Sequence, residues 1–105
     1  MSFSEFSLDS RIEKALAKKN FSKTTTVQSE VIPAILSGQD VLVKARTGSG
    51  KTLAFVVPLL SKLIALDKVN RILRKNTSSI TGLILVPTKE LSSQVSEVVK
   101  DMNLY

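Results

Sequence analysis

The chain has 105 residues, of which 43% are hydrophobic and 23% charged, and this composition predicts one small globular domain with a buried core. It contains no cysteine and no histidine, which excludes a disulfide framework, a thiolate or imidazole metal site and any histidine-dependent catalytic triad. The 15 Lys and Arg exceed the 9 Asp and Glu, giving a formal net charge of +6. This excess favours anionic partners such as nucleic acid or nucleotide, although many domains are simply basic.

No segment has the character of a membrane anchor or a secretion signal. The most apolar stretch, residues 53–66, contains Lys62 and falls short of the ~20 residues that a membrane span needs. Residues 1–5 lack both the basic and the apolar region of a signal peptide. We therefore expect a soluble intracellular protein without membrane contact.

The first third of the chain predicts two helices. Apolar residues at helical spacing predict a helix over residues 9–19, with Ser10 and Glu13 placed as a capping box. A second apolar stripe predicts a helix over residues 27–36, which ends at the Ser-Gly pair that follows it. Pro33 lies inside that helix and is expected to kink it.

The remainder alternates apolar runs with helical patterns. Residues 41–43 and 83–86 are unbroken apolar runs, as expected of buried strands. Helices are predicted over 51–66 and 89–102, and a basic connector over 67–81, where a solvated charge run is the simplest interpretation. Strand, helix, strand, helix with both strands apolar predicts an α/β fold with a parallel sheet.

The clearest chemical signal is a phosphate-binding loop between the first strand and the next helix. Its spacing fits G-x-x-x-x-G-K-[ST], except that the first glycine is replaced by alanine. The residues are Ala45, Arg46, Thr47, Gly48, Ser49, Gly50, Lys51 and Thr52. Gly48 and Gly50 allow a tight turn whose N–H groups face one anion, and the helix that follows presents its N-terminus to the same phosphates. Lys51 can contact the β and γ oxygens, and the Thr52 hydroxyl can bind Mg²⁺.

Three further residues have open interpretations on their chemistry alone. Gln28 offers the donor and acceptor that match the edge of adenine, but Thr25 and Gln28 also have the spacing of a capping box. Phe21, like Phe3, is by default an ordinary core or lid aromatic.

A polar turn follows the second predicted strand. Thr88, Lys89 and the helix N-terminus after Pro87 could hold RNA backbone phosphates, because open α/β sheets bind ligands where strands end. A solvated helix cap is the alternative, and Glu90 is interpreted as structural.

Taken together, these stretches resemble a known family. Residues 45–52 resemble motif I of the DEAD-box RNA helicases, residues 20–28 resemble their Q motif with Phe3 as its upstream aromatic, and residues 87–94 resemble motif Ia. The resemblance implies that residues 1–105 form the N-terminal part of a RecA-like domain, with the Q motif at about 3–28. The residues of motifs I and Ia are most similar to those of the nucleolar subgroup that acts in large ribosomal subunit assembly.

The resemblance also implies roles and partners. Gln28 and Thr25 would read the adenine of ATP, with Phe3 and Phe21 flanking it, and residues 45–52 would hold its phosphates. Lys51 and Thr52 would be the catalytic residues, with Thr52 also contacting Mg²⁺. Pro87, Thr88 and Lys89 would contact RNA, most simply pre-ribosomal RNA, in the nucleus or nucleolus, together with ribosome-assembly factors.

Three positions depart from the family pattern. Asn20 stands where the family has glycine and Thr24 where it has proline, and both changes weaken the local turn chemistry. Lys89 replaces arginine, which keeps the positive charge but loses the planar fork for phosphate.

The sequence lacks several parts of a complete helicase. None of its acidic residues forms an Asp-Glu pair at the end of an apolar strand, so the motif that holds Mg²⁺ and the attacking water is absent, as is a second RecA-like domain. We therefore expect about half of one helicase domain, inactive by itself and poorly folded because its strands lack neighbours. The alternatives are a truncated product without catalysis and an unrelated P-loop kinase or GTPase.

Overall fold

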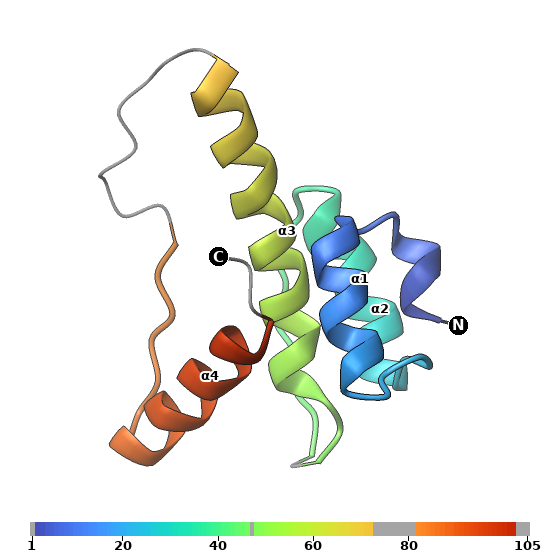
Figure 1. The fold of residues 1–105 in the computed structure, drawn as a ribbon. Coiled ribbons are helices and arrows are strands. Elements are labelled where there is room, and N and C mark those ends of the chain that lie inside the picture. The colour runs from blue at the N-terminus through green and yellow to red at the C-terminus, as the bar shows by residue number, and fades with distance from the viewer. Residues whose placement is uncertain (1, 47, 73–81, 103–105) are drawn as a thin grey trace.

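A computed structural model describes residues 2–46, 48–72 and 82–102 of the chain. In chain order the elements are η1 (Phe3–Phe6), α1 (Ser10–Lys18), α2 (Thr26–Leu36), α3 (Lys51–Ile72) and α4 (Lys89–Asp101). Helix α3 is central: α1 and α2 lie on one side of it and α4 on the other (Figure 1). The C-terminal half of α3 extends beyond these neighbours (Figure 1).

Helix α1 is capped by Asp9, not by Ser10 as the capping-box spacing predicted. The Asp9 carboxylate accepts a hydrogen bond from the backbone N–H of Arg11 at 2.9 Å, and the N–H of Glu13 bonds to the Asp9 carbonyl. The predicted helix therefore exists, but its cap lies one residue earlier. An aspartate carboxylate is an equally good N-cap and adds a favourable charge at the positive end of the helix dipole.

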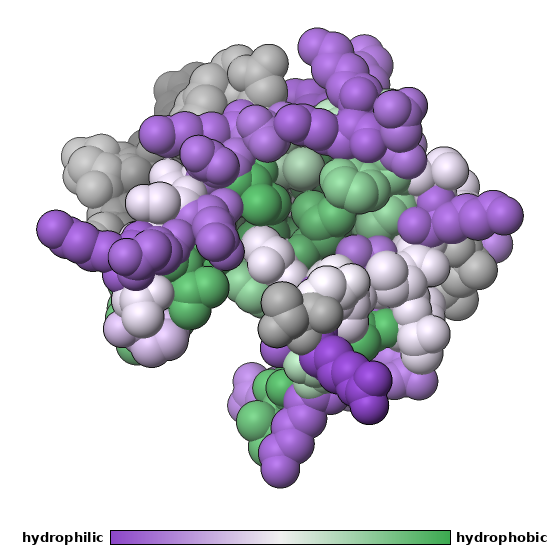
Figure 2. Space-filling model, turned by 90° about the horizontal axis from the view of Figure 1, so that it is seen from below, coloured by the Kyte–Doolittle hydropathy of each residue, from purple (hydrophilic) through white to green (hydrophobic). Residues whose placement is uncertain are grey.

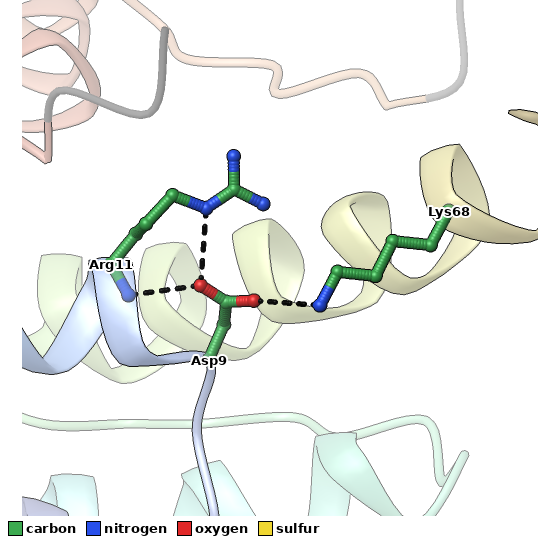
Figure 3. Close-up of polar contacts among 3 residues, drawn as sticks. All are labelled: Asp9, Arg11 and Lys68. Carbon is green, nitrogen blue, oxygen red and sulfur yellow. Dashed lines mark hydrogen bonds and ion pairs between the residues drawn. The ribbon is translucent and has the colours of Figure 1, made fainter.

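Asp9 also connects α1 to the distant part of α3. One carboxylate oxygen accepts from Arg11 Nε at 3.2 Å, and the other lies 3.1 Å from Lys68 Nζ (Figure 3). The hydrogen bond from the Arg11 backbone, supported by the Lys68 and Arg11 side chains, lowers the pKa of Asp9 although burial opposes this shift. The network thus joins the N-terminus of α1 to the C-terminal half of α3.

Helix α2 begins and ends with side-chain and turn contacts that its sequence anticipates. Thr25 is its N-cap, and the helix continues through Pro33, whose carbonyl accepts from Ser37 N at 3.0 Å. Gly38 follows with φ +91°, a backbone conformation that glycine adopts without the cost of a Cβ clash, and its N–H bonds to the Ile35 carbonyl.

Helix α3 is longer than the pattern predicted. It runs six residues past the expected end at position 66, so the first part of the predicted connector is helical. Residues 67–72 contain neither glycine nor proline, and the bond from Lys68 to Asp9 holds this part of the helix. The rest of the predicted connector, residues 73–81, lies outside the described residues.

One apolar core joins the helices. It is built from buried side chains of η1, α1, α2 and α3 together with the residue that ends α4, and its members are Phe3, Leu8, Ile12, Ala15, Leu16, Ile32, Leu53, Val56, Val57, Leu60, Ile64 and Met102. Three partly buried valines of α4 pack against it, so every helix contributes to a single cluster. None of the helices in the described ranges is long and apolar enough to cross a membrane.

The predicted parallel sheet is not formed among the described residues, which corrects this one part of the sequence-based expectation. Residues 41–43 and 83–86 form no paired strand, and the one β-bridge joins Ser2 to Lys23. Leu42 is 92% exposed and Leu85 is 85% exposed, as expected of apolar segments that lack neighbouring strands. A strand needs a neighbour to satisfy its N–H and C=O groups, and these two segments do not pair with each other. One face of the molecule shows apolar side chains surrounded by hydrophilic ones (Figure 2).

Candidate nucleotide-binding site

The loop before α3 has the tight geometry that the phosphate-binding spacing predicts. Ser49 N donates to the Arg46 carbonyl at 3.2 Å, which closes a turn. Gly48 and Gly50 have φ values of +85° and +84°, in the left-handed region that favours glycine. Helix α3 follows immediately, so its unpaired N-terminal N–H groups lie at the end of this loop.

Gln28 holds this loop against the start of α2. Its side-chain Oε1 accepts from Thr25 N at 2.9 Å, and its Nε2 donates to the Gly50 carbonyl at 3.2 Å. The Thr25 hydroxyl accepts from Gln28 N at 3.2 Å, which completes a capping box. Gln28 is 3% exposed, so these bonds satisfy a buried amide. The capping-box alternative is therefore present, and it is combined with a contact to the phosphate loop that the spacing did not reveal.

Gly50 is fixed by the same contact. A Cβ at this position would lie 2.5 Å from Gln28 Nε2 and 3.1 Å from Thr25 Oγ1. Its carbonyl accepts both from Gln28 and from Ala54 N, the latter at 3.1 Å in the first turn of α3. Gly48, by contrast, has open space where a Cβ would be. The two glycines thus have different roles: both allow the backbone to turn, but only Gly50 makes room for Gln28.

The loop has the features of an anion site. Ser49 Oγ is buried without a hydrogen-bond partner among the described residues. Lys51 is exposed at the first position of α3, and Thr52 beside it is partly buried. An unsatisfied hydroxyl, free helix N–H groups and a lysine converge here, and this donor set suits a phosphate. Ala45 and Arg46 precede the turn, and Thr47 lies outside the described residues.

A metal would find few ligands in this part of the chain. No group of three or more Asp and Glu side chains that could hold a metal occurs among the described residues. The Thr52 hydroxyl at the start of α3 is the candidate ligand that the motif predicts.

The two aromatic residues that were expected to flank adenine lie together, but away from Gln28. Phe3 and Phe21 line a pocket of about 430 Å³, together with Asn20 and Glu13. Phe3 is 3% exposed and belongs to the core, whereas Phe21 is 43% exposed. Gln28 does not line this pocket; it faces the phosphate loop instead.

The polar turn before α4 forms a helix cap. Thr88 Oγ1 accepts from Leu91 N at 3.2 Å, and Pro87, Thr88 and Lys89 are all exposed. In Figure 1 the start of α4 and the loop before α3 lie at the same, lower end of the molecule. The capping alternative is therefore realised, and the exposed Lys89 remains accessible to a ligand.

The chain is similar in sequence to one family of known proteins. The profile of the DEAD/DEAH box helicase family matches residues 25–104. The chain is 43% identical over 103 residues to ATP-dependent RNA helicase dbp9 of Schizosaccharomyces pombe, covering 98% of this chain and 17% of the relative. It is 46% identical over 101 residues to DEAD-box ATP-dependent RNA helicase 16 of Arabidopsis thaliana, covering 96% of this chain and 16% of that protein.

A solved structure agrees with this assignment. The crystal structure of a DEAD box protein from Methanococcus jannaschii superimposes with a TM-score of 0.79 at 35% identity, covering 97% of this chain and 25% of that one. The chain thus spans about a sixth of the length of the two curated relatives and a quarter of the solved structure.

Proposed function

The chain belongs to the DEAD/DEAH box helicase family, and on this premise we propose that it forms the adenine- and phosphate-binding part of an ATP-dependent RNA helicase. The observation that carries the proposal is the contact of Gln28 with the Gly50 carbonyl. It joins the residue that would read the base to the loop that would hold the phosphates. Binding of the base at Gln28 is thereby coupled to the conformation of the loop that would hold the phosphates.

In this proposal residues 45–52 hold the triphosphate. Lys51 contacts the β and γ oxygens, the free N–H groups of α3 and the Ser49 hydroxyl contact the phosphates, and Thr52 contributes a ligand to Mg²⁺. The metal supplies charge neutralisation between the phosphates when it is bound. Carboxylates for the metal and for the attacking water are not among these 105 residues, so we propose that the chain by itself does not hydrolyse ATP.

Adenine recognition is assigned to Gln28. Its amide uses one lone pair for Thr25 and one N–H for Gly50, which leaves one acceptor and one donor position for the base edge. Phe3 and Phe21 are proposed to flank the base. Because their pocket does not include Gln28, the base would have to lie between this pocket and Gln28.

RNA is the proposed substrate. Pro87, Thr88 and Lys89 are exposed at the start of α4, where hydroxyl, ammonium and backbone N–H groups suit a phosphate backbone that is bound without regard to sequence. The similarity to dbp9 and to the nucleolar subgroup supports a role in ribosome assembly, on pre-ribosomal RNA and with assembly factors in the nucleolus. A nucleotide-binding chain without catalysis is the second candidate, favoured by the missing Asp-Glu pair.

The phosphate-loop assignment is tested by Lys51→Ala in a full-length helicase polypeptide that carries residues 1–105. We expect at least a tenfold loss of ATP affinity and no measurable turnover, because a charge-assisted contact to phosphate is removed. Lys62→Ala, an exposed lysine on the same helix, is the matched control and should leave both unchanged. ATPase activity near the unsubstituted level in Lys51→Ala would refute the assignment.

The base-recognition assignment is tested by Gln28→Ala in the same polypeptide. ATP binding should weaken far more than binding of inorganic triphosphate, because only the former uses the base. Competition between ATP and GTP is measured in parallel on the unsubstituted protein. Equal competition by the two nucleotides would contradict adenine recognition by Gln28.

A further inference from the structure

Four cationic side chains line a groove between α1 and α4, and no described residue of the loop before α3 lines it. Arg11, Lys14 and Lys18 are spaced three and four residues apart, so they follow one face of α1, and Lys100 borders the groove from the last turn of α4. The groove has a volume of about 420 Å³.

Among the described residues, the positive charge of this groove is only partly neutralised. Its one lining carboxylate, Asp101, is paired with Lys19, with Nζ and Oδ2 at 3.1 Å. Within the described part of the chain, Lys14, Lys18 and Lys100 take part in no ion pair, and all three are exposed. An unpaired cluster of like charges disfavours the unbound state and attracts an anion.

Arg11 is held at one end of the groove. Its Nε bonds to Asp9, whose other carboxylate oxygen is taken by Lys68, so the guanidinium is oriented while its remaining donors stay available. At the other end the Lys19–Asp101 pair closes the groove between the ends of α1 and α4.

We propose that this groove, defined by Arg11, Lys14, Lys18 and Lys100, binds the phosphate backbone of RNA as a second contact region. The choice of RNA as ligand rests on the proposed helicase function. The three α1 cations span about 10 Å, enough to meet two or three phosphates of one strand. An acidic protein partner is disfavoured, because the apolar floor is already buried and offers a partner little area to cover.

Helix α4 connects the groove, which lies at its C-terminal end, to the proposed RNA contact at its N-terminal end. Thr88 caps the N-terminus of α4, and Lys100 lies in its last turn, about 18 Å along the helix axis. A strand held at Thr88 and Lys89 therefore reaches Lys100 within a few nucleotides by following α4.

The test compares two double variants in the full-length polypeptide that carries residues 1–105. Binding of fluorescent oligouridine is measured by anisotropy over a range of salt concentrations. For Lys14→Gln/Lys18→Gln we expect about three- to tenfold weaker binding at low salt and a salt slope smaller by about 1.4, since each single-strand phosphate contact contributes about 0.7. Lys23→Gln/Lys62→Gln removes the same charge from exposed positions outside the groove and should change the slope by less than half as much.

Additional variants and one additional ligand distinguish failure of the groove proposal from failure of the helicase proposal. Lys14→Arg/Lys18→Arg keeps the charge and the helix, so it should bind RNA as the unsubstituted protein does. Equal losses of RNA affinity in both glutamine variants would overturn the proposal that the groove binds RNA. Tighter binding of polyglutamate than of RNA would also overturn it. If only Thr88→Ala/Lys89→Ala weakens RNA binding, the helicase proposal survives and the groove fails. If the unsubstituted polypeptide binds no RNA, the helicase proposal fails as well.

Discussion

At the scale of single residues, Gln28 and Gly50 depend on each other. The Gln28 side chain occupies the space that a Cβ on residue 50 would need, and the same side chain satisfies the Gly50 carbonyl. The left-handed backbone of Gly50 adds a second reason for glycine. The spacing of the loop predicts the turn at Gly50, but the contact with Gln28 is not visible in the sequence, where the two residues are 22 positions apart.

Substituting the loop glycines should separate these two reasons. Gly48→Ala introduces only backbone strain, about 1–2 kcal/mol of unfolding free energy, because its Cβ would meet nothing within 4 Å. Gly50→Ala should cost clearly more, because its Cβ would also displace the Gln28 amide. Urea unfolding of the chain, followed by circular dichroism, measures both.

A double variant provides the control for the clash. In the Gln28→Ala background the additional cost of Gly50→Ala should fall towards that of Gly48→Ala, because the displaced amide is gone and only the contact with Thr25 Oγ1 remains. Strictly additive effects would show that the two side groups do not compete for space.

At the scale of elements, α1, α2 and α4 each begin with a side-chain cap. Asp9, Thr25 and Thr88 accept from backbone N–H groups at the starts of α1, α2 and α4. Asp9 is distinct because its carboxylate also reaches Lys68, 59 residues later on α3. The cap therefore stabilises one helix and positions another.

The Asp9 network should make stability depend on pH in acid. The pKa of Asp9 is lower in the folded chain than its ordinary value of 3.8, so the unfolded chain binds the proton more tightly. The stabilisation is therefore complete above about pH 4–5 and is lost as the pH falls through the folded pKa. Asp9→Asn keeps the cap but loses the charge, so its unfolding midpoint should lie below that of the unsubstituted chain at pH 7 and approach it near pH 2.

Asp9→Ala is the companion variant. It removes the cap as well and should cost about 1 kcal/mol more than Asp9→Asn at pH 7, because the Arg11 N–H loses its acceptor. A midpoint difference between Asp9→Asn and the unsubstituted chain that does not change with pH would contradict the role given to the carboxylate.

At the scale of the whole molecule, a helical core coexists with exposed apolar segments. The helices share one cluster of buried side chains, whereas residues 41–43 and 83–86 present leucines to solvent. Such segments carry unpaired backbone groups next to apolar side chains, which is the condition for edge-to-edge association. The helical core and the tendency to aggregate should therefore respond to different substitutions.

Charged residues in the exposed segments should improve solubility without unfolding the helices. For Leu42→Lys/Leu85→Lys we expect less light scattering on concentration and unchanged far-ultraviolet circular dichroism, because both side chains are already in solvent. Leu16→Lys, at a position only 1% exposed, is the contrasting variant and should abolish the helical signal. Loss of helix in the first variant would mean that these leucines support the fold.

The sequence by itself misplaced the cap of α1 and the end of α3, but it determined the approximate positions of the helices and the glycine-rich turn before α3 with the lysine that follows it. These depend on contacts within a few positions, so spacing and residue type suffice. It also predicted strands at 41–43 and 83–86 from their apolar character, but a strand is a relation between two segments, and the structure pairs neither one.

The tertiary structure decided everything that joins distant segments. Gln28 meets Gly50, Asp9 meets Lys68, and Lys19 meets Asp101, and no periodicity encodes these pairs. It also placed Phe3 and Phe21 in a pocket that does not include Gln28. The physical reason is that side-chain bonds of this kind form only after the apolar core has brought the helices together, and the packing of that core, not the local pattern, fixes which polar groups meet.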